Sequence, residues 1–228
     1  MTKTAATGPS FRLPMAAFVM PGLLLAIFLL QILAGPDMRG ALIADFGLNP
    51  ILLRAGQYDT LVTYGFLQGG VLSAVVNAVL ILLFGASVLS AMGPGPRALL
   101  SYVVFYMVGV VTAGLGFCLA HLHDNYTVVG ASGAVSILIG AGIRLPGYWG
   151  GAGRIAGLFS PRALIATALW CAYNLYGVVT HAFTHTPETS MAWESHLTSY
   201  FVGLLLIEPW LRLFHRNYMD ATPSVTTK

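Results

Sequence analysis

Three polar residues lie inside long apolar stretches of the sequence and have side chains that could act together in a reaction: Asn77, Ser132 and His196. Polar side chains are costly inside a membrane, so such residues are the first candidates for function. A serine hydroxyl is a weak nucleophile that needs a neighbouring base, which a histidine can provide. The carboxamide N–H of an asparagine can stabilise the negative charge that develops on an attacked carbonyl oxygen. These residue types therefore suit acyl transfer through a serine.

Each of the three residues also has a purely structural interpretation. Ser132, Ser136 and Gly140 follow one another at intervals of four residues, which on a helix makes a stripe of small residues suited to close packing. Taken alone, this spacing favours packing. Asn77 could make an interhelical hydrogen bond, and His196 could cap a helix or lie at the membrane interface. The segment GASG, however, places Ser132 where a helix begins, and free backbone N–H groups there could stabilise an oxyanion.

The composition indicates an integral membrane protein. Of the 228 residues, 57% are hydrophobic and 8% are charged, with a mean hydropathy of +0.77, whereas a soluble domain carries about 25% charged residues. Backbone groups in lipid must be hydrogen-bonded internally, so membrane spans should be helices. We therefore expect an all-α polytopic membrane protein with a six-helix bundle. Six apolar stretches approach the roughly 20 residues needed for a span, namely 14–34, 63–91, 98–120, 128–145, 162–182 and 196–214.

The distribution of positive charge predicts the orientation of these spans. With the N-terminus in the cytoplasm, nine of the eleven Lys and Arg residues fall in cytoplasmic segments, and only Arg39 and Arg54 fall outside. Both termini would then be cytoplasmic, and the second, fourth and sixth spans would all run from outside to inside. Ser132 and His196 each come within the first turn or two of such a span. We therefore expect them at similar depth in the membrane.

The chain contains one membrane domain, 13–215, between polar tails at 1–12 and 216–228. Its net charge of +3 is too small and too dispersed to indicate nucleic-acid binding. His181 and His185 are spaced four residues apart, and His121 and His123 lie in another outer loop. Together they could bind a metal, but no metalloprotease motif with a carboxylate accompanies them. We expect neither a metal nor another cofactor.

Three segments together have the pattern of a known family. The segment VVGASGAVSILIGA contains a GxSG core, SHLTSYFVGLLL carries His196 at the start of a span and ahead of Gly203, and TYGFLQGGVLSAVVNAVLILLFG carries Asn77 within a span. In this order they resemble the nucleophile segment, the last helix and the second span of the rhomboid family of intramembrane serine proteases. The likeness covers about residues 60–212.

The resemblance implies that Ser132 is the nucleophile and His196 the general base and acid. Such a dyad lacks an orienting carboxylate, so packing must hold the imidazole. Asn77 and the backbone N–H of Ser132 would form the oxyanion hole, and Gly130 and Gly133 would let backbone and neighbouring helices approach closely. The implied activity is cleavage of transmembrane segments of other proteins in the lipid bilayer, near its outer face. We expect the protein in a bacterial inner membrane.

Several positions depart from the family's pattern. Ser73 stands where the second span usually has a histidine, and Gln68 stands where another histidine is frequent. Ser73 is therefore a further candidate donor for the oxyanion hole, beside Asn77 and the backbone of Ser132. Ser136 replaces a bulky residue that often packs against the catalytic histidine. Ser199 replaces the first glycine of the last helix, although Gly203 fits the second. These departures leave open the alternative of a catalytically weak or inactive pseudoprotease that binds membrane clients.

Overall fold

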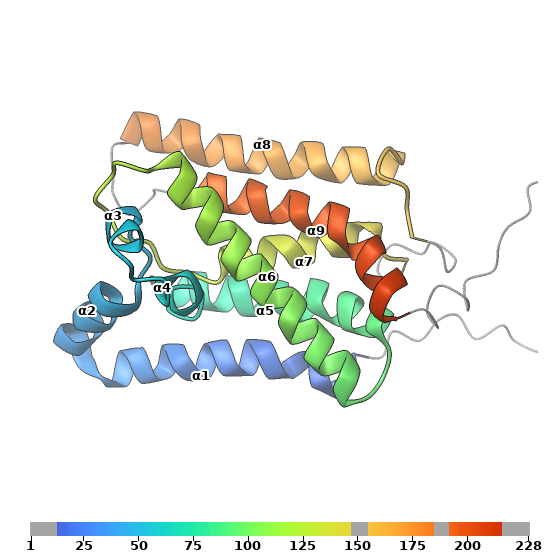
Figure 1. Ribbon diagram of the computed structural model, residues 1–228, viewed down its shortest axis with the longest axis horizontal. Helices are drawn as coiled ribbons and strands as arrows, with labels where there is room; N and C mark the ends of the chain where they lie inside the picture. Colours follow the sequence, from blue (N-terminus) through green and yellow to red (C-terminus); the bar gives the residue numbers. More distant parts are fainter. Residues whose placement is uncertain (1–12, 147–154, 185–191, 216–228) are drawn as a thin grey trace, which may run out of the picture.

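The computed structural model describes residues 13–146, 155–184 and 192–215. Within these ranges the chain is helical, and extended pairing is limited to a single bridge between Leu48 and Val128 (Figure 1). The expected all-α class is confirmed. In chain order the helices are η1 (Met15–Phe18), α1 (Val19–Leu33), α2 (Gly35–Phe46), α3 (Pro50–Arg54), α4 (Thr60–Thr63), α5 (Val71–Met92), α6 (Pro96–Ala120), α7 (Ser132–Arg144), α8 (Pro161–Thr184) and α9 (Trp193–Phe214).

Each of the six expected spans contains a helix, but the helices are not equivalent. In the described part of the chain, four segments are long and apolar enough to cross a membrane: Met15–Leu33, Val71–Met92, Pro96–Ala120 and Trp193–Phe214. The helix α8 has 24 residues but is not one of these four. The helix α7 has 13 residues, which at 1.5 Å each gives about 20 Å, less than the roughly 30 Å of hydrocarbon in a bilayer.

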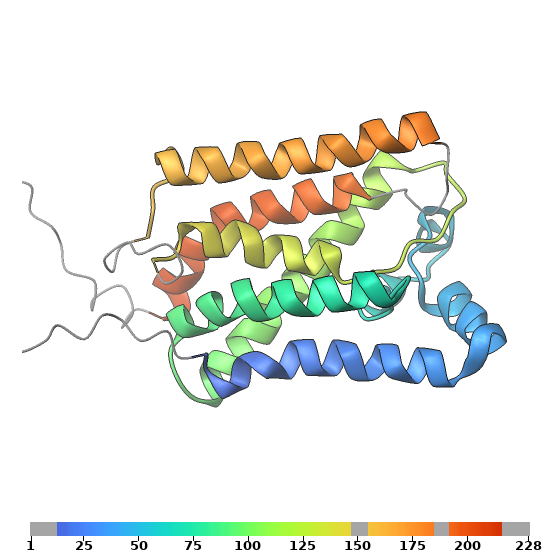
Figure 2. The same cartoon turned by 180° about the vertical axis from the view of Figure 1, so that it is seen from behind.

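The short helix α7 lies at the centre of the bundle. Every residue from Gly133 to Arg144 is buried, and α5, α6 and α9 pack around the helix (Figures 1 and 2). Because protein rather than lipid surrounds α7, its ends need not reach the surfaces of the hydrocarbon. The protein is therefore a helical membrane bundle built around a helix that is shorter than its neighbours.

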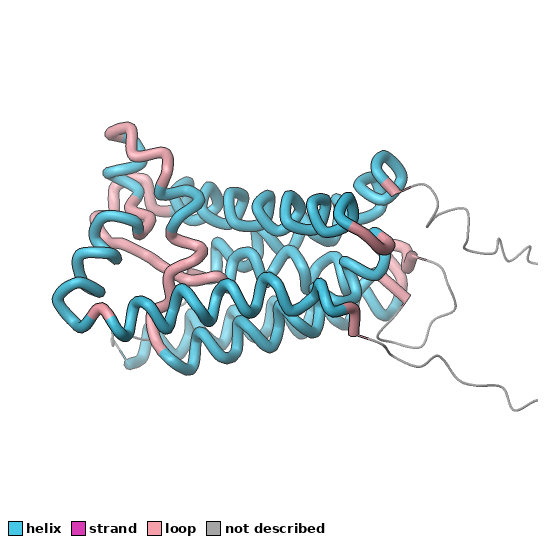
Figure 3. Tube along the Cα trace, turned by 90° about the horizontal axis from the view of Figure 1, so that it is seen from below, coloured by secondary structure: helices cyan, strands magenta, loops and turns pink. Residues whose placement is uncertain are grey.

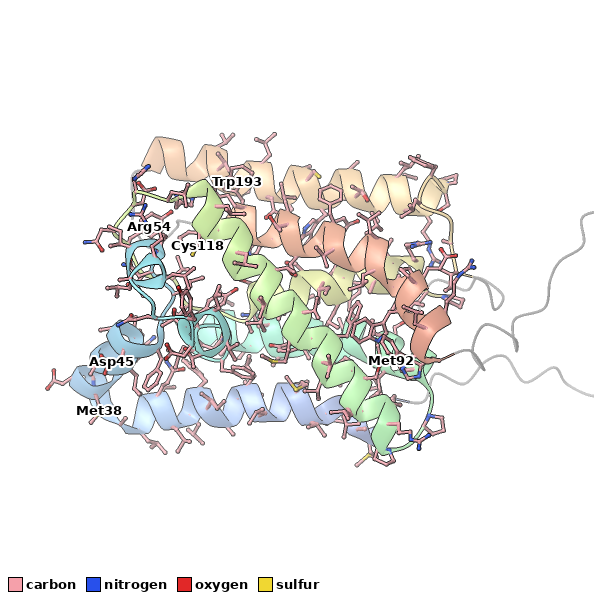
Figure 4. All side chains as sticks on the ribbon, in the orientation of Figure 1. Met38, Asp45, Arg54, Met92, Cys118 and Trp193 are labelled. Atoms are coloured by element: carbon pink, nitrogen blue, oxygen red, sulfur yellow. The ribbon has the colours of Figure 1, made fainter. Side chains whose placement is uncertain are left out.

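The beginnings of α5, α7 and α9 lie toward the same end of the bundle. These three helices run in one direction and α1, α6 and α8 in the other (Figure 1). The loops gather toward the two ends (Figure 3), and α2, α3 and α4 lie at the end where α9 begins. In Figure 4, Trp193 at the start of α9 lies toward the end that carries Asp45 and Arg54, with Met92 at the other end. This arrangement brings the N-terminal turns of α7 and α9 into the same part of the bundle.

The helices α7 and α9 meet backbone to backbone. A side chain at Gly140 would collide with the carbonyl oxygen of Tyr200, and one at Gly203 would collide with the carbonyl oxygen of Ile137. Small residues that permit such close approach are a common device of helix packing in membranes. The two glycines therefore set the distance between the helices that carry Ser132 and His196.

Candidate active site

Ser132 is the first residue of α7 and is half-buried. The chain enters the helix through Gly130, whose φ of +141° is one that residues with a side chain rarely adopt. The Gly130 N–H donates a hydrogen bond to the carbonyl oxygen of Tyr64, 3.0 Å away. As the first helical residue, Ser132 has a backbone N–H that no earlier carbonyl within the helix can accept. The nucleophile candidate thus sits beside a free backbone donor.

The residues that follow Ser132 have packing and backbone roles. The Ser136 hydroxyl donates a hydrogen bond to the carbonyl oxygen of Ser132, 2.7 Å away. A side chain at Gly133 would collide with the side chain of Ala113 on α6. The Ser136 hydroxyl therefore bonds to the backbone of its own helix, at the residue that begins the helix.

His196 lies in the first turn of α9 and is buried. Its Nδ1 lies 2.9 Å from Oδ1 of Asn174 on α8, and the ring centroid of Trp170, also on α8, is 6.1 Å from that of the imidazole. The sequence predicts that packing holds the imidazole, and the structure adds a hydrogen bond that this prediction does not contain. A side-chain amide of α8 hydrogen-bonds the imidazole, and an aromatic ring of the same helix flanks it.

An ion pair fixes the register of α7 against α9. Nη2 of Arg144 lies 2.5 Å from Oε2 of Glu208, and Nη1 of Arg144 donates to the carbonyl oxygen of Leu204 at 2.8 Å. Arg144 comes twelve positions after Ser132 in α7, and Glu208 comes twelve positions after His196 in α9. At equal rise per residue in two helices that run in the same direction, Ser132 and His196 lie at the same level of the bundle.

The two side chains are not hydrogen-bonded to each other. Among the described residues, neither Oγ of Ser132 nor Nε2 of His196 has a hydrogen-bond partner. Catalytic hydrogen bonds are often long in the free enzyme and tighten when substrate binds. Within residues 13–146, 155–184 and 192–215, no other group competes for the hydroxyl of Ser132 or for Nε2 of His196.

Asn77 belongs to a polar cluster on the first turns of α5. Its Nδ2 donates to Oε1 of Gln68 at 2.9 Å and, more weakly, to Oγ of Ser73 at 3.4 Å. The Ser73 hydroxyl itself donates to Oε1 of Gln68, 3.2 Å away. The backbone of Gln68 is held in turn by Gln31, which accepts from its N–H, and by Arg39, which donates to its carbonyl oxygen. Gln68 therefore orients both candidate oxyanion donors, a role that the sequence did not reveal.

Ser199 has a defined partner at the position where a glycine is expected. The side chain of Ser199 is fully buried and its hydroxyl donates to the carbonyl oxygen of Gly109 on α6, 3.1 Å away. A serine can therefore replace the glycine here, because its hydroxyl hydrogen-bonds the backbone of α6 and is not left buried without a partner.

A charged cluster lies beside the start of α9. Nδ1 of His121 lies 2.7 Å from Oδ2 of Asp124, and Nε2 lies 3.0 Å from Oε1 of Glu194. Burial lowers the pKa of His121, but hydrogen bonds to the Asp124 and Glu194 carboxylates outweigh it, so the pKa is raised above 6.5. Of the four histidines that could bind a metal, His121 is hydrogen-bonded in this cluster, His123 lies two residues beyond it, His181 is in α8 and His185 lies outside the described residues. Within the described part of the chain, no group of three or more histidine, cysteine or carboxylate side chains could hold a metal ion.

Comparison with known families identifies the fold. The family model of the Rhomboid domain matches residues 55–212, which is more than half of the chain. The match begins after α3, includes α5, α6, α7 and α8 and ends within α9. A comparison with curated proteins gave no match. On the family match, the chain belongs to the rhomboid family.

Proposed function

We propose that this protein is an intramembrane serine endopeptidase with Ser132 as nucleophile and His196 as general base. The observation that carries the proposal is the common level of the two residues, which follows from the Arg144–Glu208 ion pair twelve residues further along both helices. The position of Ser132 at the start of α7, beside a free backbone N–H, adds support.

The proposed reaction proceeds through an acyl-enzyme. Nε2 of His196 takes the proton of the Ser132 hydroxyl while Oγ attacks the carbonyl carbon of a peptide bond. The tetrahedral intermediate collapses, the C–N bond breaks, and the imidazolium returns the proton to the leaving amine. Water then attacks the ester with His196 as base again, which releases the new carboxyl group and restores the hydroxyl of Ser132.

Two donors would stabilise the oxyanion. One is the backbone N–H of Ser132, and the other is the side-chain amide of Asn77. The amide holds a hydrogen bond of 2.9 Å to Gln68 and a longer one of 3.4 Å to Ser73. The N–H engaged in the longer bond is the one we expect to turn toward the oxyanion. The hydroxyl of Ser73 donates its hydrogen bond to Gln68, so Ser73 would act mainly by orienting Asn77.

The expected substrates are transmembrane segments of other membrane proteins. Ser132 and His196 lie in the first turns of their helices, and the charge distribution of the sequence predicts that these turns face outward. Cleavage would then take place near the outer membrane face, with both termini of the protease in the cytoplasm, and we expect a bacterial inner membrane. A peptide bond in a regular helix is shielded by its neighbours, so segments that unwind easily would be preferred.

Cleavage of a model membrane substrate tests the proposal. The purified full chain in detergent or liposomes should cut a single-span test protein, and Ser132→Ala and His196→Ala should each abolish the product. Undiminished cleavage by either variant would overturn the assignment of the dyad.

The alternative is a pseudoprotease that binds membrane clients without cutting them. The observation in its favour is that the Ser73 hydroxyl donates its hydrogen bond to Gln68, so that fewer donors are available to the oxyanion. Co-purification of an uncut test protein with the wild type, together with no product from any of several substrates, would favour this alternative.

A further inference from the structure

We propose that Asn174 is a positioning residue that fixes the tautomer and the orientation of His196. The inference rests on the proposed function, because it assigns the state of the base in that mechanism. Asn174 lies in the middle of α8 and its side chain is 1% exposed. Its Oδ1 lies 2.9 Å from Nδ1 of His196.

The direction of the Asn174 amide follows from its second partner. Nδ2 of Asn174 donates to the carbonyl oxygen of Trp170, 2.8 Å away and one turn earlier in α8. A carbonyl oxygen can only accept, so the NH₂ group must face Trp170 and the amide oxygen must face His196. The amide could not be rotated by 180° without placing its oxygen against the oxygen of Trp170.

The fixed amide determines which nitrogen of His196 carries the proton. Because Oδ1 of Asn174 is an acceptor, Nδ1 of the neutral imidazole must be the donor. Nε2 is then unprotonated, with its lone pair free to accept the proton of Ser132. With the other tautomer, Nε2 would carry a hydrogen and could not act as the base. Asn174 thus keeps His196 in the only neutral form that the proposed reaction can use.

Holding α8 to α9 does not by itself account for a buried amide at this position. The two helices are also joined by a hydrogen bond of 2.8 Å between the hydroxyls of Thr167 and Tyr200. The rings of Trp170 and Tyr200 stack with their centroids 5.8 Å apart. A buried carboxamide in a membrane helix is costly, and an apolar residue could fill the same space. Its contact with the imidazole gives a reason for the amide.

The hydroxyl of Ser136 donates its hydrogen bond to the carbonyl oxygen of Ser132 in its own helix, not to the imidazole. Two groups of α8 approach His196: the amide of Asn174 and the ring of Trp170, at 6.1 Å between centroids. Where Ser136 offers no bulky side chain, α8 therefore supplies contacts to the imidazole.

Three variants of the full chain test the inference. Asn174→Ala removes the acceptor, Asn174→Asp keeps an acceptor and adds a charge, and Thr167→Val removes an α8–α9 hydrogen bond that does not touch His196. The first readout is the rate at which a fluorophosphonate labels Ser132, measured across pH. The second is ¹⁵N NMR of histidine-labelled protein, which distinguishes the two imidazole tautomers, with His196→Ala identifying the signal.

We expect Asn174→Ala to slow labelling about 10- to 100-fold and to give a mixture of tautomers at His196. Asn174→Asp should retain most of the rate at high pH, with the acidic limb of the profile moved to higher pH because a carboxylate stabilises the imidazolium. Thr167→Val should leave the tautomer unchanged and the rate within about twofold, because the hydrogen bond that it removes touches neither His196 nor Ser132.

Unchanged labelling and an unchanged tautomer in Asn174→Ala would overturn the inference. The inference would also be overturned if Thr167→Val and Asn174→Asp slowed labelling as much as Asn174→Ala does and the pH profile of Asn174→Asp were not displaced. Asn174 would then act through packing alone. The NMR readout needs no activity. A wild type that is not labelled but holds one Nδ1–H tautomer would contradict the proposed function and still support the role of Asn174.

Discussion

Arg144 and Glu208 form an ion pair between the parallel helices α7 and α9, twelve residues beyond Ser132 on one helix and twelve beyond His196 on the other. The Arg144 side chain is 3% exposed and that of Glu208 is 30% exposed. The pair therefore holds together the end of the two helices that is remote from the candidate dyad, and it keeps the two residues of the dyad level with each other.

Loss of the Glu208 carboxylate should destabilise the bundle. Glu208→Ala leaves the buried guanidinium of Arg144 without its charged partner, and we expect a loss of about 1.5–3 kcal/mol in the free energy of unfolding. Unfolding of the protein in mixed micelles measures this loss. Arg212→Ala is the control, because Arg212 contacts the same carboxylate but is 63% exposed, so its loss should be below about 1 kcal/mol. Equal effects of the two variants would show that the buried pair does not set the register.

A methyl group at Gly140 should separate α7 from α9. Because it would collide with the carbonyl oxygen of Tyr200, Gly140→Ala should lower stability by about 1–3 kcal/mol, as overpacking of a core does. It should also slow labelling of Ser132. Gly22→Ala provides the comparison, since nothing lies within 4 Å of the added carbon there, and alanine in a helix should be neutral or stabilise by up to about 1 kcal/mol. A Gly140→Ala protein as stable as Gly22→Ala would contradict the close packing described here.

The Asn77 amide should matter far more than the Ser73 hydroxyl. Removing an oxyanion donor typically slows catalysis about 10²- to 10³-fold, so we expect a loss of this size from Asn77→Ala in cleavage of a model substrate. Ser73→Ala should cost less than about tenfold, because the Ser73 hydroxyl donates its hydrogen bond to Gln68 and we expect the residue to act mainly by orienting Asn77. Equal losses from the two variants would identify Ser73 as a direct donor.

The positions of the helices can be predicted from the sequence far better than the contacts between the helices. Each of the six apolar runs contains a helix, because hydropathy reports burial in lipid or protein directly. The second run begins at residue 63, whereas α5 begins at Val71. Residues 64–70 are apolar enough to extend the run, but Gly70 has an extended backbone and caps the helix there. A hydropathy profile averages side-chain polarity, so it does not detect the extended glycine at which the helix begins.

The candidate site was predictable only in part. Ser132, His196 and Asn77 could be selected because they are polar residues in apolar surroundings. Asn174 carried the same signal, in the segment LWCAYNLYG, and was missed because no motif drew attention to α8. Its contact with His196 joins residues 22 apart in the sequence, and it depends on which face α8 presents to α9. The bond from Gln68 to Asn77 depends likewise on the bend of the chain before α5, which spacing does not determine.

The His121 cluster should make stability depend on pH. The pKa of His121 is raised above 6.5 in the folded protein, so its stabilising contribution is complete below that pH and is lost as the pH rises through the raised value. The difference in melting temperature between wild type and His121→Gln should therefore be larger at about pH 5.5 than at about pH 9. His123→Gln, which changes an exposed histidine two residues away, serves as the control. A difference that is independent of pH, or that grows at high pH, would contradict this account.

If Ser132 is an activated nucleophile, a fluorophosphonate should modify it, and intact-mass analysis detects this without any knowledge of the substrate. We expect the wild type to gain the mass of one phosphonyl group, peptide mapping to place that group on Ser132, Ser132→Ala to gain none, and His196→Ala to gain it far more slowly. A wild type that stays unlabelled, or a label that persists in Ser132→Ala, would contradict this role of Ser132.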